Sequence, residues 1–189
     1  MDADAEARWA ELTEGACPAP DDLLLLVAEL LDDPAHGGTR DALDEQSRLL
    51  FAERSRMARA NRLTTALRFD LGYRTDERLR PELLSLTSVV RTRVGHPLLI
   101  AVVAVALLRR AGQPATVCHA EGRWFAALSG SPLVVIDVEP GERPAAVRPV
   151  CGHLVGYTVI SSLLRVLDGP RVSTLDRLLE DLPVATPAD

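Results

Sequence analysis

Apolar and polar positions change their spacing twice along this chain. In the first part apolar residues recur every three or four positions, which is typical of helices with one buried face. Such spacing predicts a helical first stretch up to about residue 33, with a helix start at residues 20–22, a second helix over 39–67 either continuous or with one break, and helices over 81–94 and 97–110. Short runs rich in β-branched residues then predict strands over residues 114–119, 122–128 and 132–138. The helical spacing returns in residues 153–167 and 173–182.

The segment from Leu98 to Leu108 is apolar at all of its eleven positions. A membrane span requires about 20 such residues, so this segment is predicted to be a helix buried on every side within the protein. Arg109, Arg110 and Gly112 follow it and are typical of a helix C-terminus. We expect an α+β fold in which this helix packs on a small antiparallel sheet.

The length of 189 residues fits a single domain. Residues 22–94 form a helical lead-in, residues 95–150 hold the buried helix and the strands, and residues 151–183 form closing helices. Residues 140–149 are expected to be a loop or a weak strand. We expect residues 1–20 to be loosely attached to this packed core.

Composition and charge exclude several classes of function. The formal net charge is −6, so the chain lacks the positive field that binds phosphate backbones. Aromatic residues make up 4%, which leaves few platforms for stacking bases, and we expect no nucleic-acid partner. The segment MDADAEARWAEL lacks the features of a signal peptide. We therefore expect a cytoplasmic protein that does not associate with membranes, and the sequence leaves its oligomeric state open.

Five segments in order resemble the bacterial SirB-type branch of the transglutaminase-like superfamily. The longest is VVRTRVGHPLLIAVVAVALLRRAGQPA, which is followed by EGRWFAAL and VVIDVEPG. Asp44 with RLLFAE lies upstream, and Cys151-Gly152-His153 lies downstream. The resemblance covers roughly residues 22–183. It implies a papain-like core with additional helices at both ends.

Active members of this superfamily carry a Cys-His-Asp triad, and the resemblance places its three positions at Pro97, Arg123 and Asp137. In the family the Cys opens the central helix, whose N-terminus favours the thiolate, and the His acts as the base. A proline ring cannot attack a carbonyl carbon, and an arginine stays protonated and cannot act as a base. The branch itself commonly lacks the Cys.

We therefore expect a non-catalytic, degenerate member that binds a protein, a peptide or a small ligand in the former cleft. Arg123, Trp124, Asp137 and His96 are its candidate binding residues. Arg123 and Asp137 are expected to form a charge-assisted pair where an active enzyme has its His and Asp. His96 precedes the buried helix and could instead donate to its first turn or lie solvated in a loop.

An enzyme with altered acyl-transfer, amide-transfer or hydrolase chemistry is the alternative, with Cys151, His153 or His119 as relocated groups. Cys151 and His153 would share a face in an extended segment but not in a helix. Cys118 cannot form a dyad with His119, because neighbouring strand residues point to opposite faces. Cys17 lies beside Pro18 in a loop and is expected to be an exposed bystander. An odd number of widely spaced cysteines argues against a disulfide framework. A purely structural subunit of a complex is the third hypothesis.

Neither a metal nor a cofactor is indicated by the sequence. The four histidines and three cysteines lack the spacing of a zinc site. All 21 basic residues are arginines, which excludes a Schiff-base lysine. Arg91, Arg93, Arg109 and Arg110 flank the buried helix and could either bind an anion or be solvated helix ends.

Overall fold

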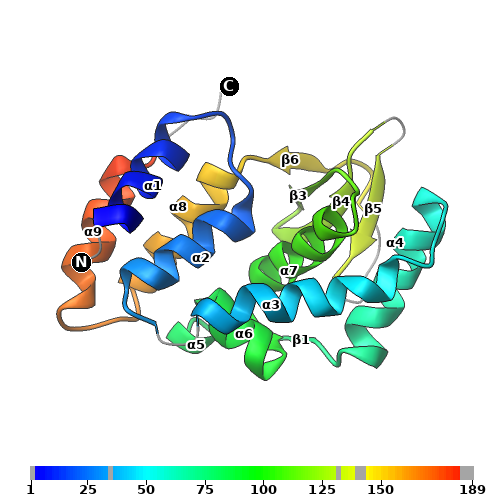
Figure 1. The fold of residues 1–189 in the computed structure, drawn as a ribbon, viewed down its shortest axis with the longest axis horizontal. Helices are drawn as coiled ribbons and strands as arrows, with labels where there is room; N and C mark the ends of the chain where they lie inside the picture. Colours follow the sequence, from blue (N-terminus) through cyan, green and yellow to red (C-terminus); the bar gives the residue numbers. More distant parts are fainter. Residues whose placement is uncertain (1–2, 34–35, 131–132, 139–143, 184–189) are drawn as a thin grey trace.

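The computed structural model describes residues 3–33, 36–130, 133–138 and 144–183 (Figure 1). Within this part of the chain the longer helices are α1 (Ala3–Glu14), α2 (Pro20–Leu30), α3 (His36–Ser47), α4 (Arg56–Thr65), α7 (Pro97–Arg110), α8 (Gly152–Leu164) and α9 (Arg171–Asp181). Shorter helical pieces are η1 (Arg48–Leu50), η2 (Ala66–Asp70), α5 (Pro81–Leu84) and α6 (Leu86–Thr92). The strands are β1 (Arg74–Thr75), β2 (Val94–Gly95), β3 (Ala115–Ala120), β4 (Arg123–Leu128), β5 (Val134–Asp137) and β6 (Arg148–Val150).

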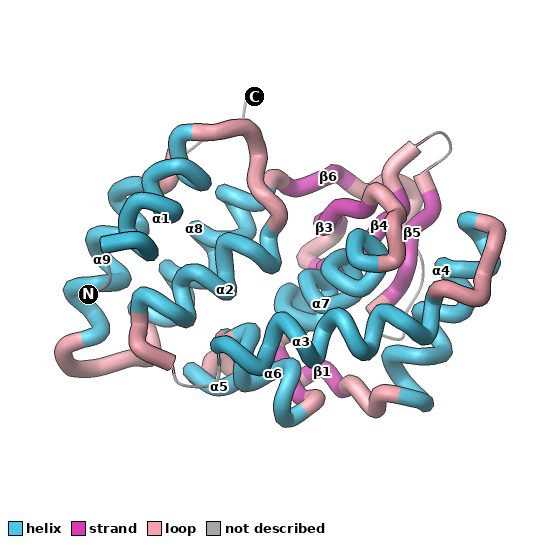
Figure 2. Tube along the Cα trace, in the orientation of Figure 1, coloured by secondary structure: helices cyan, strands magenta, loops and turns pink. Residues whose placement is uncertain are grey.

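The main sheet has the strand order β5-β4-β3-β6, and its neighbours are antiparallel. The α7 helix lies against this sheet, α2, α3 and α6 pack on α7, and α4 lies beside the edge strand β5 (Figure 2). The expected α+β architecture, with a central apolar helix on a small antiparallel sheet, is confirmed.

Side chains alternate between the two faces of this sheet. Val117, Ala126 and Ile136 lie on the face toward α7 and belong to the main hydrophobic core. Cys118 and Phe125 lie on the other face, where they form a second, smaller core. The two-residue turn at Glu121 and Gly122 sets the register between β3 and β4. This register determines on which face of the sheet each β4 side chain lies.

The α7 helix is the centre of the main core. Every residue from Pro97 to Leu108 is buried, and the exposed fraction does not exceed 2% from Leu98 onward. Helices α2, α3 and α6 cover α7 on the side away from the sheet. After α7, Gly112 has a φ of +73°, a conformation that favours glycine, and this confirms the predicted C-terminal stop.

Two predicted helices are broken. The segment 81–94 divides at Ser85, whose backbone is extended and whose Oγ accepts a hydrogen bond from the Ser88 amide, so that it caps α6. The segment 39–67 is interrupted between η1 and α4. β1 and β2 form a short parallel pair, Arg74 with Val94, that was not predicted.

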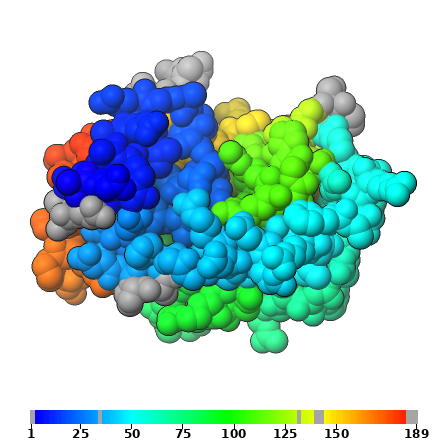
Figure 3. All heavy atoms as spheres, viewed as in Figure 1, coloured from blue at the N-terminus to red at the C-terminus, as the bar shows by residue number. Residues whose placement is uncertain are grey.

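Residues 1–20 were expected to be loosely attached, and the structure corrects this. Trp9 of α1 is 4% exposed, and its Nε1–H donates to Asp181 of α9 over 3.1 Å. Arg177 of α9 donates to Glu6 over 2.9 Å. In the space-filling view, the blue N-terminal helices accordingly pack beside the orange and red C-terminal segment (Figure 3). In the predicted loop or weak strand 140–149, residues 148–149 belong to β6, and residues 140–143 lie outside the described residues.

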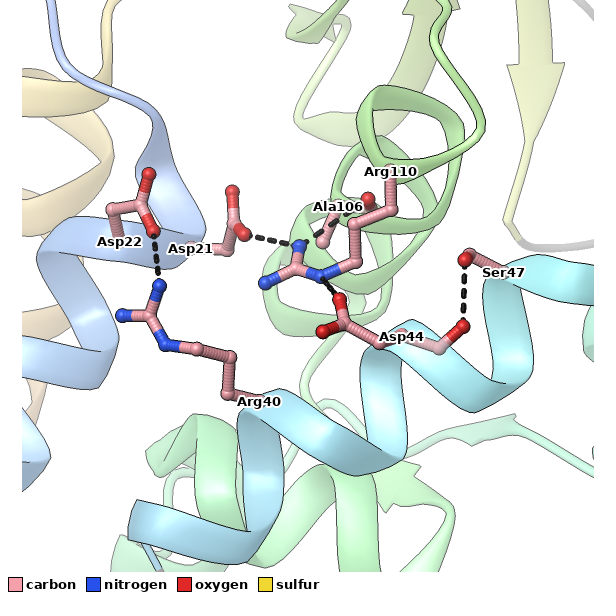
Figure 4. A network of polar contacts seen from close by, with 7 residues as sticks. All are labelled: Asp21, Asp22, Arg40, Asp44, Ser47, Ala106 and Arg110. Carbon is pink, nitrogen blue, oxygen red and sulfur yellow. Dashed lines mark hydrogen bonds and ion pairs between the residues drawn. The ribbon is translucent and has the colours of Figure 1, made fainter.

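The C-terminal end of α7 is held by one arginine between two carboxylates (Figure 4). Arg110 Nη1 lies 2.5 Å from Asp21 of α2, and its Nε lies 2.7 Å from Asp44 of α3. The same guanidinium donates to the Ala106 carbonyl at the end of α7 over 3.3 Å. The Arg110 and Asp21 side chains are 15% and 4% exposed. Arg110 is therefore a buried residue that connects α7 to α2, and not a solvated helix end.

Replacing Arg110 with alanine should leave the buried Asp21 carboxylate without its counter-charge. We expect Arg110→Ala to lower the free energy of unfolding by about 3–5 kcal/mol, measured by urea denaturation. Arg40→Ala is the matched control, because the Arg40–Asp22 pair beside it is exposed, and it should change stability by less than about 1 kcal/mol. Equal effects of the two substitutions would contradict the role given to Arg110.

Candidate functional site

The start of α7, where the resemblance places the cysteine of active members, is capped by its own residues. Pro97 occupies the first helical position, where its missing N–H costs no hydrogen bond, and it is buried. His96 is the cap: its Nδ1 accepts a hydrogen bond from the Leu98 amide over 3.3 Å. His96 therefore accepts from the first turn, and does not donate to it. Burial lowers the pKa of His96, so the neutral ring that can act as an acceptor is favoured.

Arg123 and Asp137 lie on the face of the sheet that is turned away from α7. Arg123 Cζ is 5.1 Å from the centroid of the Phe125 ring in the second core, and Phe125 is paired with Asp137 in the register of β4 and β5. The sheet thus separates both side chains from Pro97. The structure does not bring the three former triad positions together, and a direct pair between Arg123 and Asp137 stays a prediction.

His119 and Trp124 lie on the α7 face of the sheet. They are paired across β3 and β4, and their ring centroids are 4.6 Å apart. Cys118 lies on the opposite face with an exposed fraction of 0%, and burial raises the pKa of its thiol to about 11. As expected from strand alternation, Cys118 and His119 do not form a dyad.

Cys151 and His153 are brought together at the start of α8. Cys151 caps this helix with an extended backbone, and its Sγ lies 3.7 Å from Nδ1 of His153. The Nε2–H of His153 donates to the Leu12 carbonyl over 2.8 Å. Since a carbonyl can only accept, this bond assigns the ring proton to Nε2 and leaves a lone pair on Nδ1.

The prediction that Cys17 is a bystander is wrong. Cys17 and Cys151 form a disulfide with a Cα–Cα distance of 5.6 Å. The two residues are 134 positions apart, and an odd number of cysteines does not prevent one pair from forming while Cys118 stays free. Their approach depends on α1 and α2 packing beside α8, which local sequence patterns do not reveal.

A groove opens between α2, α6 and α8. It has a volume of about 200 Å³. Its floor is apolar and includes Leu24, Val27, Leu84, Val159 and Leu163.

Polar side chains line the edge of this groove. Arg91 and Arg171 are both exposed there, and neither has a hydrogen-bond or ion-pair partner among the described residues. Glu82 is exposed at the same edge, and Asp33 accepts a hydrogen bond from Thr87. Arg91 was among the arginines predicted to flank the buried helix, whereas Arg171 and the groove were not predicted, because they come together only when α8 and α9 pack on the lead-in helices.

The flanking arginines do not converge on one anion site. Arg93 donates to the Tyr73 hydroxyl over 2.5 Å and lies over its ring, whereas Arg110 is tied to Asp21. Among the described residues, no group of three or more Cys, His, Asp or Glu side chains is placed to hold a metal ion. No helix in that part of the chain is long and apolar enough to cross a membrane.

The sequence pattern of the transglutaminase-like superfamily matches residues 29–185, which is most of the chain. This protein therefore belongs to the transglutaminase-like superfamily. No curated protein and no solved structure matches it.

The cap at His96 makes the stability of the protein depend on pH. Because the pKa of His96 is lowered in the folded state, the unfolded chain binds a proton that the folded chain does not, and stability should fall as the pH drops below about 6.5. His96→Asn keeps a capping acceptor without a titrating ring. Urea denaturation between pH 5 and 8 should show a shallower loss of stability toward low pH in this variant. Identical slopes would contradict the assignment.

Proposed function

We propose that this protein is a non-catalytic member of the superfamily that binds a protein or peptide partner. Within the superfamily we propose that it belongs to the SirB-type branch, because its sequence carries the motifs of that branch in order. We also propose that the protein is bacterial and that it is located in the cytoplasm. The proposal rests above all on the start of α7: the position of the family nucleophile is a buried proline that serves as part of a helix cap.

The state of the three cysteines supports this proposal. Cys17 and Cys151 are joined to each other, and the Cys118 thiol is buried with a raised pKa. A thiolate is the form of cysteine that attacks a carbonyl carbon, and none of the three cysteines supplies it while the disulfide is closed. In addition, Arg123 and Asp137 lie across the sheet from α7, so a nucleophile there would lack its partners.

An enzyme that uses Cys151 and His153 is the second candidate. The distance of 3.7 Å between Cys151 Sγ and His153 Nδ1 favours it, because a base beside a thiol is the arrangement that activates a cysteine. Such an enzyme would require the disulfide to be reduced first. In a cytoplasmic location the disulfide would meet thiol reductants, so both redox states have to be assayed.

The groove between α2, α6 and α8 is the binding site that we propose. Pockets that enclose a drug-sized molecule have volumes of about 300–1,000 Å³, so 200 Å³ suits one or two apolar side chains of a partner. Arg91 and Arg171 have no partner among the described residues and can pair with an acidic residue beside those side chains. We therefore propose a peptide segment with an apolar anchor and an adjacent carboxylate.

A turnover assay separates the two candidates. We expect the purified chain to release no ammonia from a glutamine-containing peptide above the rate of a variant in which all three cysteines are alanine, before and after treatment with dithiothreitol. Turnover that is lost in Cys151→Ala and in His153→Gln would favour the enzyme and contradict the binding proposal.

Selection from a display library of random seven-residue peptides tests the groove. We expect the selected peptides to share a large apolar residue next to Asp or Glu. Arg91→Glu combined with Arg171→Glu should weaken their binding by about tenfold or more, measured by calorimetry. Glu82→Gln at the same edge is the matched control and should not weaken binding, and neither should Arg148→Glu on β6. Selected peptides whose binding ignores the two arginines would contradict the site.

A further inference from the structure

We propose that Cys17 and Cys151 form a reversible thiol–disulfide centre at the N-terminus of α8, which is reduced by thiol compounds. This activity goes beyond the binding function and lies outside the groove. Cys17 is exposed, so a reductant can reach its sulfur, whereas Cys151 is half-buried beside His153. The two sulfurs therefore have different roles.

Both sulfurs lie where a negative charge is stabilised. Cys151 is the cap of α8, a helix of 13 residues whose N-terminus carries a partial positive charge. The first amide of that helix, at Gly152, donates to Cys17 Sγ over 3.0 Å. These contacts favour the thiolate of either cysteine.

His153 adds a proton acceptor to this centre. Its Nδ1 carries a lone pair, because Nε2–H is committed to the Leu12 carbonyl, and this lone pair faces Cys151 Sγ at 3.7 Å. When the disulfide opens, Cys151 leaves as a thiolate, and Nδ1 can take up one of the two protons that the protein gains, which places an imidazolium beside the thiolate. Thiols with a stabilised thiolate leave faster in exchange reactions and favour the reduced state of a pair.

Contacts around the disulfide keep the two sulfurs close after reduction. The bond between His153 and Leu12 ties the end of α1 to α8, and Trp9 ties α1 to Asp181 of α9. The Pro18 carbonyl oxygen lies against Gly152, where it would be 2.1 Å from an added Cβ. Because these contacts do not involve the sulfur–sulfur bond, the reduced cysteines remain neighbours and can close again.

The exchange consists of two balanced steps. The thiolate of one reductant molecule attacks Cys17 Sγ, the bond between Cys17 and Cys151 breaks, and its electron pair goes to Cys151 Sγ. A second reductant thiol then attacks the reductant sulfur of the mixed disulfide and releases Cys17. In sum, two thiols become one disulfide, and the protein gains two electrons and two protons.

Equilibration of the full-length wild-type protein in glutathione buffers tests this proposal. Structural disulfides resist reduction by the glutathione pool. We expect at least half of the native protein to be reduced at Cys17 and Cys151 in buffers with mostly reduced glutathione, counted by alkylation and intact-mass spectrometry, and to reoxidise when the ratio is reversed. A disulfide that opens only in denaturant would overturn the proposal, whatever the groove binds.

The role of His153 is tested by the pH profile of alkylation. In Cys17→Ser the Cys151 thiol is free, and we expect its reaction with iodoacetamide to have a midpoint below about 8.5, the usual pKa of a thiol. Adding His153→Gln, which can still donate to Leu12, should raise this midpoint and slow alkylation at pH 6.5 by about tenfold. Cys118 serves as the internal reference and should stay unlabelled in the native protein. The same midpoint in both variants would show that His153 has no part in the centre.

Discussion

The structure depends on one constraint, the complete burial of α7. A helix that is apolar on every side has no surface that can face water, so strands must cover one flank and helices the others. Its unpaired backbone groups must be satisfied inside the protein as well. His96 accepts from the Leu98 amide in the first turn, and the amides of Ala111 and Gln113 donate to the Leu107 and Leu108 carbonyls at the other end. Arg110 in the last turn pairs with Asp21 of α2.

The proposal of a non-catalytic member also rests on the start of this buried helix. A proline at the first position of α7 supports the cap but removes the thiol, and the helix start is closed by its own histidine. The sheet separates this position from Arg123, whose face is set by the turn at Glu121 and Gly122, and from Asp137, whose face is set by its pairing with Phe125. The fold is that of the superfamily, and the binding function that we propose uses the groove between α2, α6 and α8.

Much of the fold could be predicted from local patterns. The change of spacing near residue 114, the unbroken apolar run and the stop at Gly112 are local signals, and each corresponds to an observed element. The break at Ser85 is also local in cause, because a serine that caps a new helix turn competes with continuation of the old one. The sequence alone could not show whether the Ser85 cap is more favourable than a continuous helix, because that balance depends on how α5 and α6 pack.

The candidate sites could be predicted only in part. The closeness of Cys151 and His153 follows from an extended cap, one of the two alternatives that the sequence left open. The partner of Cys151 could not be found in this way, since Cys17 approaches it through the packing of helices far apart in the sequence. Arg171 joins Arg91 for the same reason.

The central claim is that the fold no longer assembles a reacting centre at the start of α7, and Pro97→Cys tests it most directly. This variant places a thiol at the position that the resemblance assigns to the nucleophile of active members, and it leaves the residues of the sheet unchanged. We expect the new cysteine to resist iodoacetamide in the native protein as Cys118 does, and we expect no release of ammonia from a glutamine-containing peptide. Rapid alkylation of this cysteine together with sustained turnover would show that a working centre is still assembled there, and would contradict the account.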